Sequence, residues 1–148
     1  MFYTPIPAGR IFSPGVLYSD INWTSLREVV TAFGTRIREW YMQPARALEV
    51  ASGNYAFAVM ALNCLLIDTL SQFFSGEPQS KRSVFLSFVG PKLPAFSQRL
   101  STPIERPTGS NPAALEDVAQ VLYFGFRCGI LHEAHVPLYG AILRVLPR

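Results

Sequence analysis

The stretch Tyr55-Ala-Phe-Ala-Val-Met-Ala-Leu-Asn-Cys-Leu-Leu-Ile67 decides the fold, because it is the longest apolar run in this 148-residue chain. Only Asn63 interrupts it. The apolar pattern continues to Phe74, and Ser75-Gly76 is a typical helix end. The sequence therefore predicts a helix over 55–74 that is apolar almost all round and lies at the centre of the domain. The run to Ile67 is shorter than the roughly 20 apolar residues that a membrane-spanning helix takes.

The composition places the chain among globular proteins. It is 49% hydrophobic and 16% charged, which is too apolar for a disordered chain. The net charge of +3 is too mild to indicate nucleic acid by itself. Eleven arginines against two lysines suit bidentate phosphate contacts, although a GC-rich genome gives the same bias. Both cysteines lie in apolar context and no signal peptide is evident, so we expect a cytoplasmic protein without disulfides and without a membrane segment.

Before the central helix we expect an arm and one long helix. Residues 1–20 carry three prolines and two glycines and no sustained period, which predicts an extended arm. A helix should then begin at the N-cap Asn22, and Pro44 should end or kink it. A short helical piece over 45–52 follows, with Gly53 as its left-handed cap. The long helix has an apolar stripe of helical period formed by Trp23, Leu26, Val30, Phe33, Ile37 and Trp40.

After the central helix the pattern predicts two more helices. One spans 84–96 and bends at Gly90-Pro91, and a proline-rich loop covers 101–112. The last helix should begin at Asn111-Pro112 and run to Glu133 or His135, followed by a short apolar tail. The predicted fold class is therefore all-α: one up-and-down bundle of four to five kinked helices over 21–148, preceded by the arm 1–20.

The ionisable groups are densest in Phe126-Arg-Cys-Gly-Ile-Leu-His-Glu-Ala-His135, which holds both histidines. Cys128, His132 and His135 are spaced i, i+4 and i+7, so they could supply three metal ligands on one helix face. A Cys128–His132 nucleophile pair is a second interpretation. The same residues can also be purely structural, with Cys128 in the core and the histidines at the favourable negative end of a helix.

A third interpretation pairs Arg127 with His132. An arginine stays protonated and can stabilise charge on a phosphate, whereas a histidine can move a proton near neutral pH. Together they suffice for RNA cleavage without metal. On an α-helix a five-residue step separates two side chains by about 140°, so they would flank one edge and not stack. The alternative is structural: Arg127 pairs with a buried acid, for which Asp68 in the apolar central helix is the obvious candidate.

Arg127-Cys-Gly-Ile-Leu-His132 fits the R-x4-6-H motif of the HEPN superfamily. The phrase Arg-Cys-Gly-Ile-Leu-His-Glu-Ala resembles that of a group of bacterial HEPN-like proteins. The expected helix order also resembles the family over most of 22–136. Cys128 stands where the family more often has a polar residue, and Ala134 stands where one branch has tyrosine.

The resemblance implies a helical bundle that dimerises through its motif helices. In many members it also implies metal-independent endoribonuclease activity in toxin–antitoxin, phage-defence or CRISPR-linked systems. We therefore expect a homodimeric ribonuclease with Arg127 and His132 as catalytic residues and with Glu133, Asp68 and Cys128 in support. RNA and an antitoxin or other protein are the expected partners, and no cofactor or metal is expected. A non-catalytic dimerisation or protein-interaction module is the alternative.

Overall fold

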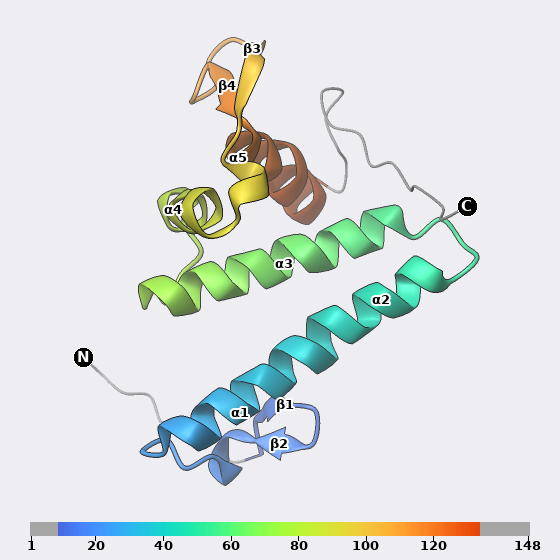
Figure 1. Ribbon diagram of the computed structural model, residues 1–148, viewed down its shortest axis with the longest axis vertical. Coiled ribbons are helices and arrows are strands. Elements are labelled where there is room, and N and C mark those ends of the chain that lie inside the picture. The colour runs from blue at the N-terminus through green and yellow to red at the C-terminus, as the bar shows by residue number, and fades with distance from the viewer. Residues whose placement is uncertain (1–8, 134–148) are drawn as a thin grey trace. The chain divides into compact units, whose positions relative to one another are not determined.

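The computed structural model describes residues 9–133 and divides at Ala51/Ser52 into two compact units (Figure 1). Helices make up most of the described residues, which confirms the helical character that the sequence predicts. Two small antiparallel sheets of two strands each are also present, so the chain is not purely α-helical. The single bundle over 21–148 stays a prediction, and the two units are described separately.

A hairpin opens the described part of the first unit. β1 (Ile11–Ser13) pairs with β2 (Val16–Leu17), and Gly15 takes the positive φ of 72° that their tight turn needs. A 3-10 turn, η1 (Tyr18–Asp20), follows. Residues 9–20 are thus folded, and not simply an extended arm, because Phe12 is buried in a cluster with Ile21 and Ala32. Residues 1–8 lie outside the described range.

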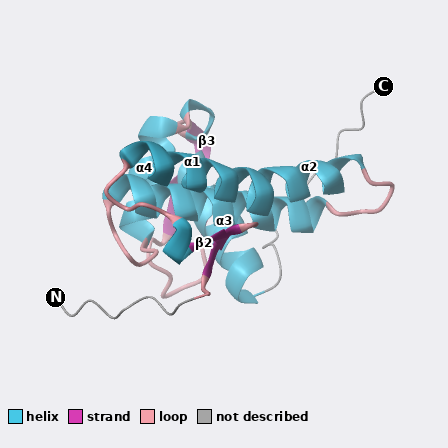
Figure 2. Cartoon of the chain, turned by 90° about the horizontal axis from the view of Figure 1, so that it is seen from below, coloured by secondary structure: helices cyan, strands magenta, loops and turns pink. Residues whose placement is uncertain are grey.

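One continuous helical run completes the first unit (Figure 2). α1 (Leu26–Ile37) passes through the π-helical turn η2 (Arg38–Met42) into α2 (Gln43–Val50). Ser25, not the predicted Asn22, is the N-cap, since its side chain accepts the Glu28 N–H. Pro44 was expected to end or kink this helix, but the helical backbone continues through it. The wider π-helical turn directly before Pro44 accommodates its missing N–H donor.

The second unit is built on α3 (Ala56–Ser75), which confirms the predicted central helix. The helix ends at Gly76, as the sequence predicts, and Gly76 takes the left-handed conformation. The left-handed cap predicted at Gly53 is wrong, because Gly53 has no positive φ. α4 (Arg82–Lys92) and the π-helix η4 (Leu122–Glu133) both pack against α3. A 3-10 turn, η3 (Pro94–Phe96), follows α4. The buried cluster of this unit consists of Cys64, Phe85, Val89, Ala119, Leu122 and Tyr123.

α3 is longer than the apolar run from which it was predicted. Its 20 residues and mean hydropathy of 1.6 are sufficient, by length and composition alone, to cross a membrane. The core helix of a globular domain passes the same test, and α3 contributes Cys64, Asp68 and Ser71 to the buried residues of the second unit. Large apolar side chains are nonetheless exposed along it, namely Phe57, Leu65, Phe73 and Phe74.

The segment before the last helix is a hairpin and not the predicted loop. β3 (Arg99–Glu105) pairs antiparallel with β4 (Ala114–Asp117), and Leu115 on β4 is completely buried. Pro103 is compatible with β3 because both strands of a two-stranded sheet are edges, and the pairing register shifts between Arg99 and Ile104. The prediction that 101–112 is irregular was therefore wrong for its first half.

The last helix consequently begins later than predicted. Asn111-Pro112 is a cis peptide in the hairpin connection, and the N-cap is Asp117, whose carboxylate accepts the Gln120 N–H at 2.7 Å. One α-helical turn, α5 (Val118–Val121), leads into η4. The helix was predicted to end at Glu133 or His135. The structure describes the backbone only as far as Glu133, so this end and the predicted apolar tail are not tested.

Candidate functional site

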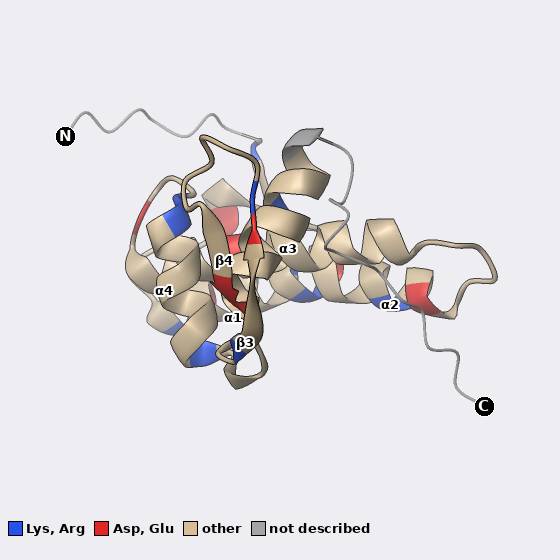
Figure 3. Ribbon diagram, turned by 90° about the horizontal axis from the view of Figure 1, so that it is seen from above, with Lys and Arg blue, Asp and Glu red and all other residues tan. Residues whose placement is uncertain are grey.

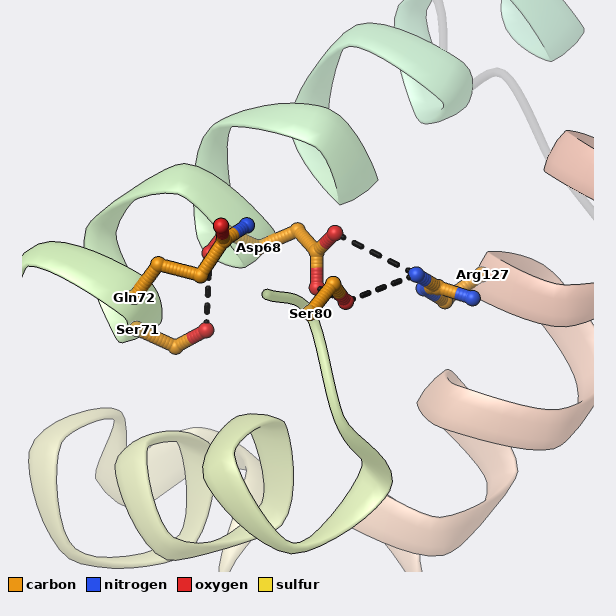
Figure 4. Close-up of polar contacts among 5 residues, drawn as sticks. All are labelled: Asp68, Ser71, Gln72, Ser80 and Arg127. Carbon is orange, nitrogen blue, oxygen red and sulfur yellow. Dashed lines mark hydrogen bonds and ion pairs between the residues drawn. The ribbon is translucent and has the colours of Figure 1, made fainter. Parts of the chain in front are cut away.

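A buried ion pair joins α3 to η4 in the second unit (Figure 4). Arg127 Nη2 lies 3.3 Å from Asp68 Oδ2, and each side chain is only 11% exposed. Asp68 is the one charge in the apolar helix α3, so it requires a partner, and Arg127 provides it. This is the pairing that the structural alternative predicts from the sequence.

Ser80 completes the cluster from a third element, the connection between α3 and α4. Its hydroxyl accepts a hydrogen bond from Arg127 Nη2 at 2.7 Å and donates one to Asp68 Oδ1 (Figure 4). One hydroxyl thus bridges both charges. Sequence reasoning missed Ser80, which carries no motif and stands in a polar connection. Its only signal is its position two residues before the helix that begins at Arg82.

Aromatic and sulfur groups surround the guanidinium. Arg127 Cζ lies 5.5 Å from the ring centroid of Tyr123, a cation–π distance. Burial lowers the pKa of Arg127, but the charge of Asp68 and the hydrogen bond to it outweigh that effect, so its pKa is raised overall. Burial raises the pKa of Tyr123, and the neighbouring Cys128 raises it further. The guanidinium is therefore held in its charged form.

Cys64 lies in the same interior as a neutral thiol. It is completely buried, and burial raises its pKa from 9.0 to about 12. The positive charge of Arg127 partly opposes this shift, while Asp68 and Cys128 add to it. Because the thiolate is the reactive form, Cys64 is inert at neutral pH. Cys128 is half-buried, and neither cysteine forms a disulfide.

The π-helical form of η4 changes the relation between positions 127 and 132. The five-residue step was predicted to place them about 140° apart on an α-helix. A π-helix, bonded i to i+5, has about 4.4 residues per turn, so the same step separates two backbone positions by about 50°. Positions 127 and 132 thus lie on nearly the same side of η4, a correction to the α-helical expectation.

The described residues hold only part of the predicted site. They bring Arg127 and Asp68 together, with Cys128 adjacent in sequence. The side chains of His132 and Glu133 lie outside the description, and so does His135. Among the side chains that the structure describes, those of residues 9–131, no group of three His, Cys, Asp or Glu could hold a metal. The Cys128–His132–His135 site stays a prediction, because two of its three side chains are not described.

Comparison of the chain with protein-family models, with curated proteins and with solved structures found no match. The resemblance to the HEPN superfamily therefore depends on the motif from Arg127 to His132 and on the helices around it.

Proposed function

We propose that this chain is a metal-independent endoribonuclease of HEPN type, with RNA as its substrate and Arg127 and His132 as its catalytic pair. The observation that supports this best is the π-helical geometry of η4, which brings backbone positions 127 and 132 to nearly the same side of the helix. With both positions on one side of η4, both side chains can face one groove between η4 and its symmetry copy. Asp68 and Ser80 support the pair by holding the guanidinium in place.

In the proposed mechanism His132 moves the proton and Arg127 stabilises the charge. His132 takes the proton of the ribose 2′-OH, or gives one to the leaving 5′-oxygen, as the 2′-oxygen attacks phosphorus. Arg127 offsets the negative charge that develops on the phosphate oxygens. Glu133 is the second residue that we expect to orient the pair, beside Asp68. No step in this scheme requires a metal.

The proposed site is composite and forms across a homodimer. The Arg127 side chain is only 11% exposed, so a substrate could reach just its outer edge. A groove between η4 and its symmetry copy would let Arg127 of one protomer and His132 of the other act on one phosphate. We propose a cytoplasmic role in a toxin–antitoxin or phage-defence system, where an antitoxin would be the protein partner.

The test is cleavage of single-stranded RNA by the purified chain in EDTA. His132→Ala should abolish cleavage, whereas His135→Ala, a matched control in the same segment, should retain it. Arg127→Lys is the informative change at 127, because lysine keeps a charge for Asp68 but loses the planar fork. Arg127→Ala would leave Asp68 buried and unpaired, so its loss of activity could reflect unfolding. Wild-type activity in His132→Ala and in Arg127→Lys would refute the mechanism.

The composite arrangement has its own test. Co-refolding Arg127→Lys with His132→Ala gives heterodimers that contain one intact pair only if the pair forms across the interface. Recovered cleavage in the mixture supports that arrangement. If both single variants are inactive and the mixture stays inactive, the pair lies within one protomer.

A second function, a non-catalytic dimerisation or protein-interaction module, is favoured by one specific observation. Asp68 and Ser80 both accept from Arg127 Nη2 inside the unit, which is how a structural ion pair is satisfied. The exposed Phe57, Leu65, Phe73 and Phe74 on α3 agree with a protein-binding role. Tight self-association without RNA binding at any salt concentration would favour this module over the ribonuclease.

A further inference from the structure

Two arginines of the second unit converge on one aromatic ring. Arg106, the residue directly after β3, has its Cζ 4.3 Å from the ring centroid of Phe124. Arg82, the first residue of α4, has its Cζ 5.5 Å from the same centroid. Phe124 itself belongs to η4. The start of α4, the residue after β3 and η4 thus bring two guanidinium groups within cation–π distance of one ring.

Backbone carbonyls of the hairpin connection fix both groups. Arg82 Nη1 donates to Asn111 O at 3.3 Å, and Arg106 Nη1 donates to Pro112 O at 3.1 Å. These acceptors are neighbours in the chain, so the two side chains are held beside each other. Each guanidinium uses Nη1 for this bond, and its other N–H donors are available to a ligand.

The charges of Arg82 and Arg106 are not neutralised by acids. Within residues 9–133 the ion pairs are Lys81–Glu77 and Arg127–Asp68, and neither Arg82 nor Arg106 is paired with a carboxylate. Arg82 is exposed and Arg106 half-buried. Figure 3 shows basic segments on α4 and both basic and acidic segments along the β3–β4 hairpin. Two like charges held together repel one another, and an anion bound between them removes that repulsion.

We propose that Arg82 and Arg106 form a phosphate-binding subsite for single-stranded RNA, next to the Arg127 centre. The guanidinium fork matches phosphate oxygens bidentately, and the carbonyls of Asn111 and Pro112 pre-organise both forks. The subsite binds the backbone and not a base, since the two guanidinium groups lie close to the Phe124 ring on which a base would stack.

A chain of ring contacts connects the subsite to Arg127. Phe124 meets Tyr123 edge-on with centroids 5.0 Å apart, and Tyr123 lies beneath Arg127 at 5.5 Å. Arg82 also follows Ser80 by two residues. The subsite and Arg127 are thus connected through two adjacent residues of η4, Phe124 and Tyr123. The identification of the ligand as RNA rests on the proposed ribonuclease function.

The test measures binding of a fluorescent oligouridylate to the full-length chain in EDTA over a range of salt concentrations. All variants carry His132→Ala, so that cleavage does not interfere. Arg82→Gln/Arg106→Gln should lower the affinity at least about tenfold at low salt. Because each phosphate contact in a single strand contributes about 0.7 to the slope of log affinity against log salt, losing the one phosphate held at the subsite should lower the slope by about 0.7.

Arg27→Gln/Arg46→Gln is the matched control, since it removes the same charge from two exposed arginines of the first unit. Its affinity should change less than about threefold. Equal effects of the two double variants, or no effect of Arg82→Gln/Arg106→Gln, would overturn the subsite. If the glutamine variant does not fold, Arg82→Lys/Arg106→Lys tests the subsite instead, because it keeps both positive charges but loses both planar guanidinium groups. It should still bind more weakly than the control.

Two further probes identify the ligand. Inorganic phosphate should compete with the oligouridylate only at millimolar concentration, and polyglutamate should compete poorly. Equal competition by polyglutamate would indicate an acidic protein partner and refute the RNA assignment. The two proposals also fail differently. RNA binding that depends on Arg82 and Arg106, without cleavage by the wild-type chain, would refute the ribonuclease alone. Cleavage and binding that survive Arg82→Gln/Arg106→Gln would refute the subsite alone.

Discussion

Asp68 and Arg127, fifty-nine residues apart in the chain, meet as a buried ion pair 3.3 Å long between α3 and η4. The pair joins the central helix to the helix that carries the proposed site. Removing one member leaves a buried charge without its partner, which costs more than the intact pair contributes. The interaction is therefore a constraint on which helices pack together, in addition to any role it has in catalysis.

We expect single and double substitutions at this pair to be strongly non-additive. Asp68→Leu and Arg127→Met should each lower the free energy of unfolding by about 3 kcal/mol, because each leaves one buried charge. The double variant should lose less than the sum, since it leaves neither charge. Urea unfolding of the four proteins measures the coupling. Additive losses would contradict a direct interaction between Asp68 and Arg127.

Ser80→Ala should destabilise the second unit by about 1–3 kcal/mol, because the hydroxyl bonds both Arg127 and Asp68. Ser83→Ala is the matched control: Ser83 lies three residues later in α4 and is exposed. It should change the unfolding free energy by less than about 0.5 kcal/mol. Similar midpoints for the two variants in urea would show that the Ser80 bridge contributes nothing.

The buried thiol of Cys64 should make stability depend on alkaline pH. Its pKa is about 12 in the folded protein against 9.0 without burial, so the unfolded chain releases this proton first as the pH rises. The contribution of Cys64 is then complete below about pH 9 and declines between about pH 9 and 12. The difference in unfolding free energy between wild type and Cys64→Ala measures the contribution of this thiol alone, because the tyrosines, which also titrate at alkaline pH, are the same in both proteins. A difference that stays constant over that range would contradict the raised pKa.

Gly76→Ala should cost about 1–2 kcal/mol, because Gly76 ends α3 with a φ of 69°, where a side chain is strained. Gly34→Ala adds the same methyl group inside α1, with open space around it and no positive φ. It should stabilise by about 0.5–1 kcal/mol. Thermal melting of both variants measures whether each substitution raises or lowers the stability. A stabilising Gly76→Ala would show that this helix end does not need a left-handed residue.

Local signals in the sequence predicted α3, its end at Gly76 and the ion-pair partner of Arg127. Asp68 was predictable because a lone charge in an apolar helix must be paired. The role of Ser80 was not predictable. It depends on how α3, the connection after it and η4 pack together, and a serine in a polar connection carries no local signal of this. Asn111-Pro112 was wrongly predicted to begin a helix, because the residue types that begin helices also form turns. The strand β3 was not predicted because it contains Pro103, which is uncommon in strands other than edge strands. The π-helical form of η4 has no periodic signal that distinguishes it from an α-helix, so the 127–132 relation needed the structure.

The π-helical turn η2 also marks the place where the first unit can accommodate a change in length. A π-helical turn contains about one residue more than an α-helical turn, and such turns arise by inserting a residue into a regular helix. Each π-helical residue turns the chain by about 80°, against about 100° for an α-helical residue, so six π-helical steps turn it about as far as five α-helical steps. Deleting one residue within Arg38–Met42 would therefore restore the α-helical repeat and leave α2 in nearly the same rotation about its axis relative to α1. The π-helical turn makes the phase between the two helices independent of one residue in the length of the segment that joins them.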